Sequence, residues 1–227
     1  MKFLLLQIFL ASFVAVHAQS SAECPKYHLV WVSCTSCKGM DFVGVAVLDA
    51  LKSKGFDVDG NYVEYPANTP RNASSLQGAI NLASDIETYA NKCPNQTFIL
   101  GGYSQGVISL HRTSIPINLI ERIAAVTAFG DPVPGNNFYP ICELDRAVVT
   151  CGDSDKWCND PTRGPRDKED PIKNIHVPGN HQSAYDRSAA DAAINAIMDK
   201  IKNPKSADCT PPPQPEVSFD HRLDYES

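Results

Sequence analysis

The sequence has little positive charge, no long hydrophobic run after its first residues and no cluster of metal-ligating side chains. Twenty Lys and Arg face 26 Asp and Glu, a formal net charge of −6, so nucleic acid and anionic membrane surfaces are poor partners. The apolar run from Phe3 to Val16 is too short to span a membrane, and no later run reaches its length. Cys34 and Cys37 have the spacing of half a zinc site, but no second close pair accompanies them, so we expect no metal.

The first residues are typical of a signal peptide. Lys2 supplies a positive start, the apolar run follows, and Val16-His17-Ala18 offers the small residues that signal peptidase needs. We predict a signal peptide over residues 1–18 and a secreted chain. All eight cysteines lie beyond it, and an even count in an exported protein indicates disulfides.

Short apolar, β-branched segments alternate with segments of helical periodicity. This pattern predicts a mostly parallel sheet of about five strands with helices on both faces, a three-layer α/β/α sandwich. The domain should cover residues 19–203, with a polar loop over 159–180, and the Pro-rich acidic tail over 204–227 should be disordered. We expect strands at 28–33, 61–65, near 98–101, 124–129 and 146–150, and helices at 42–54, from Ser74 or Ser75 to 93, from 105, and at 188–201.

The chain is organised around Gly102-Tyr103-Ser104-Gln105-Gly106, which joins the third predicted strand to a helix. A strand, a sharp turn and a helix expose a serine hydroxyl at the carboxyl end of a sheet. The turn crowds neighbouring backbones, so a Cβ at Gly102 or Gly106 would clash. Ser104 is therefore the predicted nucleophile.

Ser104 needs an imidazole to take its proton and a carboxylate to orient that imidazole. In enzymes with this turn the chain order is Ser, then Asp or Glu, then His. His181 stands directly before the last predicted helix and is the predicted base. The other histidines are less suitable: His28 precedes the serine, His111 lies two helical turns beyond it and should be partly exposed, His176 neighbours His181, and His221 falls in the tail.

The sequence identifies the carboxylate that orients the imidazole less clearly than it identifies the base. Asp131 follows a predicted strand, but its Gly-Asp-Pro setting favours a structural turn residue. Asp153 and Asp155 lie between Cys151 and Cys158, where a bridge would close a short rigid ring around them. Spacing alone does not choose between these two aspartates.

The negative oxygen of the transition state needs preorganised donors. One should be the N–H of Gln105, directly after the nucleophile. The second should come from the loop after the first strand, where Thr35 offers an N–H and a hydroxyl.

These motifs together resemble the cutinase family of secreted serine esterases, which includes acetylxylan esterases. The resemblance rests on Cys93-Pro94, Gly101–Gly106, Phe129-Gly-Asp-Pro132, Cys-x3-Asp-x2-Cys over 151–158, and His181 with Tyr185. It implies a lidless minimal α/β-hydrolase that cleaves carboxylic esters without a cofactor. The residues implied are Ser104, His181 and Asp155 as the triad, Thr35 and Gln105 as oxyanion donors, and the disulfides Cys24–Cys93 and Cys151–Cys158.

Two segments depart from the family pattern. The loop from Val32 to Cys37 lacks the family's usual Arg, Gly and Glu, and Cys34 and Cys37 have either each other or Cys142 and Cys209 as partners. The loop over 159–180 is rich in charges, which are costly to desolvate against a polyester. We therefore favour soluble or polysaccharide-borne short acyl esters over cutin.

The predicted function is thus a secreted, monomeric serine esterase acting on a cutin-type polyester or short-chain acyl esters during cell-wall degradation. The alternatives are an acetylxylan esterase acting on plant cell-wall polysaccharide, and a non-catalytic secreted elicitor or binding protein on the same fold. If Ser104→Ala left every ester activity and every biological effect unchanged, the last of these alternatives would be favoured.

Overall fold

A computed structural model describes residues 24–133, 139–141, 144–159 and 172–203. The predicted signal peptide and the predicted tail lie outside these residues. Among the described helices, none combines the length and apolar character needed to cross a membrane. In chain order the elements are β1 (Tyr27–Val32), α1 (Phe42–Ser53), β2 (Val58–Tyr62), α2 (Arg71–Lys92), β3 (Thr97–Tyr103), α3 (Gln105–Arg112), α4 (Ile117–Ile120), β4 (Ile123–Phe129), η1 (Leu144–Arg146), β5 (Ala147–Gly152), β6 (Lys173–Val177) and α5 (Arg187–Lys202).

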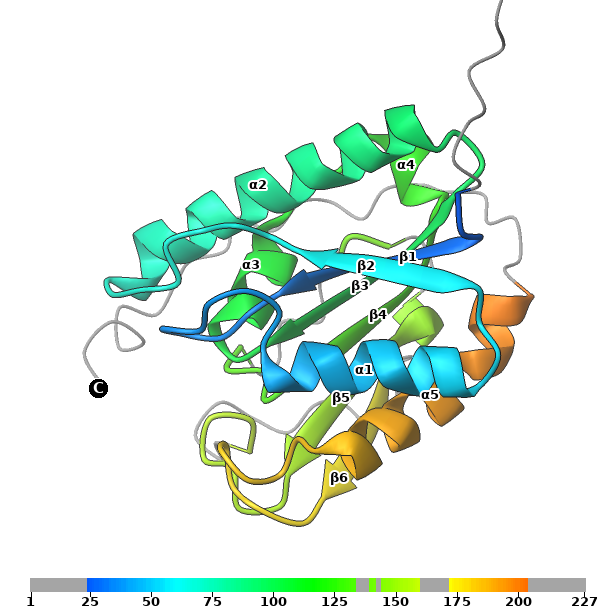
Figure 1. Cartoon of the computed structure of the whole chain (residues 1–227). Helices are drawn as coiled ribbons and strands as arrows, with labels where there is room; N and C mark the ends of the chain where they lie inside the picture. The colour runs from blue at the N-terminus through cyan, green and yellow to red at the C-terminus, as the bar shows by residue number, and fades with distance from the viewer. Residues whose placement is uncertain (1–23, 134–138, 142–143, 160–171, 204–227) are drawn as a thin grey trace, which may run out of the picture.

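The described strands form one parallel sheet of six, in the order β2-β1-β3-β4-β5-β6 (Figure 1). The predicted α/β architecture is confirmed, with one strand more than expected. The additional strand, β6, lies inside the segment predicted as a polar loop. It is an edge strand, paired only with β5, and an edge strand tolerates exposed polar residues such as Lys173 and Asn174.

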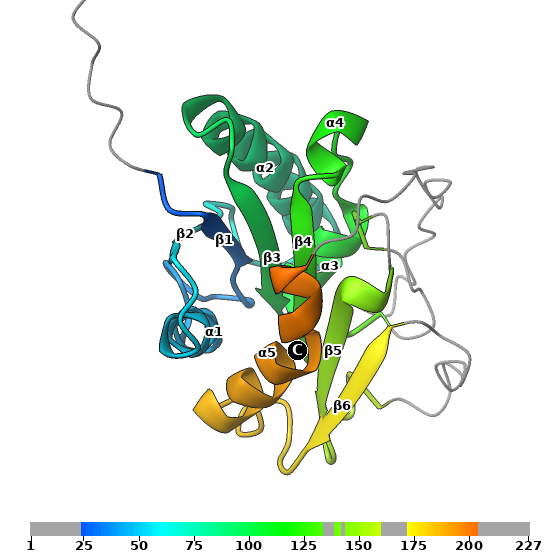
Figure 2. The ribbon, with the colours of Figure 1, turned by 90° about the vertical axis from the view of Figure 1, so that its right-hand side faces the viewer.

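Helices cover both faces of the sheet. Figure 2 shows α1 and α5 on one side and α2, α3 and α4 on the other. Successive side chains of a strand point to opposite faces, and β1 follows this rule. Leu29 and Trp31 pack with α1 and α5, whereas Val30 and Val32 pack with α2 and α3. Parallel strands buried on both faces explain the continuous apolar runs of β1, β3 and β4.

Two predicted elements have boundaries that are wrong by several residues. Helix α2 begins at Arg71 rather than at Ser74 or Ser75, and the Ser74 hydroxyl instead accepts the N–H of Asn68 at 3.1 Å. Strand β2 covers Val58–Tyr62, so it begins and ends three residues before the predicted 61–65. Residues 63–65 continue past the sheet toward the end of β1, where the Tyr65 hydroxyl donates to the Ser33 carbonyl.

Candidate active site

Ser104 occupies the turn between β3 and α3. Its φ of 54° and ψ of −116° lie in a region that residues other than glycine rarely adopt, as expected where surrounding structure enforces strain at a functional residue. The turn brings backbones together as the sequence predicted. A Cβ at Gly106 would lie 1.9 Å from the Val32 carbonyl oxygen, and one at Gly102 would lie 2.9 Å from the Gly106 carbonyl carbon.

The structure brings His181 to Ser104. The His181 Nε2 atom lies 2.8 Å from Ser104 Oγ, and Nδ1 lies 2.8 Å from Asp155 Oδ2. His181 stands in a turn before α5, where the Asn180 side chain accepts the N–H of Gln182 at 3.0 Å. The Tyr103 hydroxyl donates to the His181 carbonyl, so β3 orients both sides of the serine–histidine contact.

Asp155 is the buried acid of the Cys151–Cys158 ring. Its Oδ1 accepts the N–H groups of Trp157 at 2.9 Å and Cys158 at 3.3 Å, and its Oδ2 also accepts the Tyr185 hydroxyl. Burial acts to raise the pKa of Asp155, but the hydrogen bonds from His181, Tyr185 and Trp157 outweigh it and lower the pKa below its ordinary value. The carboxylate therefore stays ionised beside the imidazole.

The neighbouring candidates stay apart from Ser104. Asp153 and His176 are both exposed and lie 4.0 Å from each other. His28 is buried in β1, with Nδ1 2.5 Å from Asp59 Oδ1 and Nε2 2.9 Å from Asn61 Oδ1. His221 lies outside the described residues.

The prediction of a partly exposed His111 is wrong. Helix α3 is buried between the sheet and α2, and the His111 side chain on it has no exposed surface. The His111 Nε2 atom lies 3.1 Å and 3.2 Å from the two carboxylate oxygens of buried Asp131. Asp131 also accepts the Tyr139 hydroxyl at 2.9 Å and the N–H of Val133 at 2.9 Å, which fits its predicted role in a turn.

Ser104 opens into a cavity of about 430 Å³. Both predicted oxyanion residues, Thr35 and Gln105, line it. Gln105 is the first residue of α3, and a helix cannot satisfy its first N–H groups internally, so the N–H of Gln105 suits an incoming oxygen. The Gln105 side chain is used elsewhere, because its Nε2 donates to the Asn68 carbonyl at 3.0 Å.

Sequence reasoning missed several residues of the cavity wall. The Arg71 guanidinium lies 5.6 Å from the centre of the Trp157 ring, and both residues line the cavity. The Trp157 ring centre lies 6.4 Å from that of His181. Nothing local in the sequence signals this wall, because its residues come from the start of α2 and from the 151–158 ring. Phe42, Ile108 and Pro132 add apolar side chains to the cavity wall.

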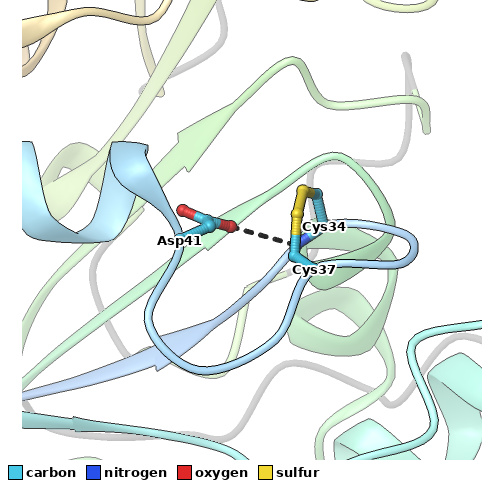
Figure 3. A group of neighbouring side chains, drawn as sticks. All are labelled: Cys34, Cys37 and Asp41. Atoms are coloured by element: carbon cyan, nitrogen blue, oxygen red, sulfur yellow. Dashed lines mark hydrogen bonds between the residues drawn. A yellow bond between two sulfur atoms is a disulfide. The ribbon is translucent and has the colours of Figure 1, made fainter.

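The described cysteines pair as Cys24–Cys93, Cys34–Cys37 and Cys151–Cys158. The first and third are the pairs that the resemblance implied, and the second resolves a choice the sequence left open. Cys142 and Cys209 lie outside the described residues. Within the described part of the chain, Cys34, Cys37 and Asp41 form one close group of ligand-type side chains (Figure 3), but its two sulfurs are bonded to each other and offer no thiolate.

A family model described as Cutinase matches residues 23–200, which is most of the chain. This chain belongs to the cutinase family. Among curated members, it is 38% identical over 114 residues to a cutinase of Hypocrea jecorina (strain QM6a), covering 48% of this chain and 44% of that protein. It is 37% identical over 101 residues to the carboxylesterase Culp1 of Mycobacterium tuberculosis (strain ATCC 25618 / H37Rv), covering 43% of this chain and 46% of the relative. These matches span less than half the length of each relative.

Solved structures of the cutinase family share the fold. The cutinase of Trichoderma reesei, solved with a phosphonate inhibitor, superimposes with a TM-score of 0.61 at 24% identity, covering 78% of this chain and 77% of that one. The catalytic core of an acetyl xylan esterase from Trichoderma reesei gives a TM-score of 0.59 at 17% identity, covering 78% of this chain and 100% of that one. At these identities the likeness concerns the fold alone.

Proposed function

We propose that this cutinase-family chain is a serine hydrolase of carboxylic esters, with Ser104, His181 and Asp155 as its triad. The observation that carries the proposal is the unbroken hydrogen-bond chain from Ser104 through His181 to Asp155 beside an open cavity. Membership of a family whose curated members include cutinases and carboxylesterases supports the same chemistry.

The reaction follows from this geometry in two steps. Ser104 Oγ attacks the ester carbonyl carbon while His181 Nε2 takes its proton, and Asp155 stabilises the resulting imidazolium. The carbonyl oxygen becomes an oxyanion that receives hydrogen bonds from Gln105 and Thr35. The tetrahedral intermediate expels the alcohol, which takes the proton from His181, and an acyl-serine remains. Water then attacks the acyl-serine, His181 takes the water's proton, and the acid is released as Ser104 regains its proton.

We propose acyl esters that are soluble or carried on polysaccharide as the substrate class, with cutin-type polyester as the competing one. The surface before His181 supports this choice. Of the apolar residues there, Ile172 is buried and Ile175 and Val177 pack against the core, while Lys173 and His176 are exposed. An edge of this kind offers polar side chains rather than apolar area to a waxy surface.

We further propose that the chain is exported and acts outside the cell as a monomer. The signal peptide predicted over residues 1–18 supports export. The disulfides support it too, because such bonds persist in oxidising compartments.

The test measures hydrolysis of p-nitrophenyl acetate, butyrate and longer esters, together with acetylxylan and a cutin-type polyester, by the wild type and Ser104→Ala. We expect short soluble esters and acetylxylan to be cleaved faster than long-chain esters and polyester. Ser104→Ala should retain less than about a thousandth of the wild-type rate. Rates that rise with chain length would reverse the substrate assignment. Absence of hydrolysis by both proteins would instead favour a non-catalytic binding protein, and equal hydrolysis by both would show that Ser104 is not the nucleophile.

A further inference from the structure

Three of the four backbone N–H groups between Cys34 and Cys37 are in use. The N–H of Cys34 donates to Asp41 Oδ2 at 3.0 Å, that of Ser36 to the Ala67 carbonyl at 2.5 Å, and that of Cys37 to the Cys34 carbonyl at 3.1 Å. The N–H of Thr35 makes no hydrogen bond to any residue that the structure describes. Thr35 also lines the Ser104 cavity, so its N–H is the one of these four that is left for a ligand there.

Asp41 fixes the near end of this loop. Besides the N–H of Cys34, its carboxylate accepts Trp31 Nε1 at 3.1 Å and the N–H of Gly44 at 3.0 Å (Figure 3 shows the bond to Cys34). Asp41 is buried and is the N-cap of α1. One carboxylate therefore ties the loop both to β1 and to the start of a helix.

The Cys34–Cys37 disulfide restrains the same loop by linking the residues on either side of Thr35 and Ser36. It closes over Thr35 and Ser36, parallel to the hydrogen bond from the N–H of Cys37 to the Cys34 carbonyl. A disulfide that closes so short a segment restricts the unfolded chain far less than the Cys24–Cys93 bond, which spans 69 residues. Its main effect is therefore local, on the two residues that it encloses.

We propose that the Cys34–Cys37 disulfide and Asp41 are positioning groups that hold the Thr35 N–H as an oxyanion donor toward the Ser104 cavity. The inference rests on the proposed function. Both groups act on Thr35 through the loop backbone, and Cys34 is also part of the cavity lining. Preorganised donors matter because they stabilise charge that appears only in the transition state, so their displacement lowers kcat more than it changes KM.

The test compares a Cys34→Ala/Cys37→Ala double variant with a Cys24→Ala/Cys93→Ala control. The control removes a disulfide at the amino end of the sheet, away from Ser104. Assays use p-nitrophenyl butyrate at a temperature where circular dichroism shows both variants folded. We expect the Cys34/Cys37 variant to lose about tenfold to a hundredfold in kcat with less than a twofold change in KM. The control should keep the wild-type kcat.

A second measurement distinguishes displacement of the oxyanion donor from a general loss of order in the site. A phosphonylated serine has an oxygen where the oxyanion forms, so inactivation by a fluorophosphonate should slow by the same factor as kcat. Asp41→Asn keeps the size of the side chain but replaces one acceptor oxygen with a donor group, and it should show the same pattern. This variant carries the test if the double cysteine variant does not fold.

The outcomes distinguish this inference from the proposed function. A wild type that neither hydrolyses esters nor reacts with the fluorophosphonate would refute the proposed function. An active wild type whose folded Cys34/Cys37 variant keeps its kcat, or changes only in KM, would overturn the positioning role and leave the proposed function intact.

Discussion

Replacing Tyr185 with Phe removes one hydroxyl that links two parts of the candidate site. The Tyr185 hydroxyl donates to Asp155 and accepts the N–H of Gly152 at 3.0 Å, and the side chain is fully buried. Burial raises the pKa of Tyr185, and the Asp155 carboxylate raises it further, so the hydroxyl remains a donor at every working pH.

The substitution leaves the Gly152 N–H buried without its partner and takes one charge-assisted hydrogen bond from Asp155. Each loss costs about 1–3 kcal/mol, and the two share one hydroxyl, so we expect a total of about 2–3 kcal/mol in the free energy of unfolding. For a domain of this size each kcal/mol lowers Tm by about 2–4 °C. Tyr185→Phe should therefore melt roughly 4–12 °C below the wild type. Its kcat should fall less than about tenfold, because the bond between Asp155 and His181 remains.

Urea denaturation at pH 7 and thermal melting measure the loss of stability of Tyr185→Phe. Tyr27→Phe is the matched control. Tyr27 is also buried, but its hydroxyl donates only to the Ile201 carbonyl, at 3.2 Å and away from the site. The control should lose about 1 kcal/mol and no activity. A Tyr185→Phe variant as stable as the wild type, or no less stable than Tyr27→Phe, would refute this account of the Asp155 environment.

Three further substitutions test other parts of the structure. Gly106→Ala should give no soluble folded protein, measured by yield and circular dichroism, because its Cβ would lie 1.9 Å from the Val32 carbonyl oxygen; a folded variant would contradict the tight turn. For Asp155, whose pKa is lowered on folding, the ionised form stabilises the fold above the unfolded pKa of about 3.9, and this contribution is lost as pH falls through the lower folded pKa. The difference in unfolding free energy between the wild type and Asp155→Asn should thus be constant above about pH 5 and shrink below pH 4, whereas a constant difference down to pH 2 would count against a lowered pKa. Cys24→Ala/Cys93→Ala should cost about 4 kcal/mol in urea denaturation, and a loss below 1 kcal/mol would show that the bond hardly restricts the unfolded chain.

Local sequence was sufficient for features that depend on neighbouring residues. The turn around Ser104 needs glycines at fixed spacing, and chain order together with the position directly before the last helix separated His181 from the other histidines. The choice between Asp153 and Asp155 was beyond spacing, because the two lie two residues apart in one ring. Their environments differ only in three dimensions, where Asp155 is buried under four hydrogen-bond donors and Asp153 is exposed.

Features that depend on contacts distant in sequence were missed. His111 looked exposed because periodicity cannot tell which helix packs over α3, and Asp131 lies 20 residues further along the chain. Strand β6 was not predicted because it mixes exposed polar side chains with partly buried apolar ones. Its hydrogen bonding to β5 makes it a strand, and this pairing cannot be read from its own sequence. The contact of Arg71 with Trp157 likewise joins segments that only the fold brings together.

The most direct test of an activated serine is labelling with a fluorophosphonate, with the modified residue located by mass spectrometry. We expect one adduct, on Ser104, that forms within minutes on the wild type and is lost or slowed at least a hundredfold in His181→Ala. Labelling of another residue, or equal labelling of Ser104 with and without the His181 imidazole, would contradict it.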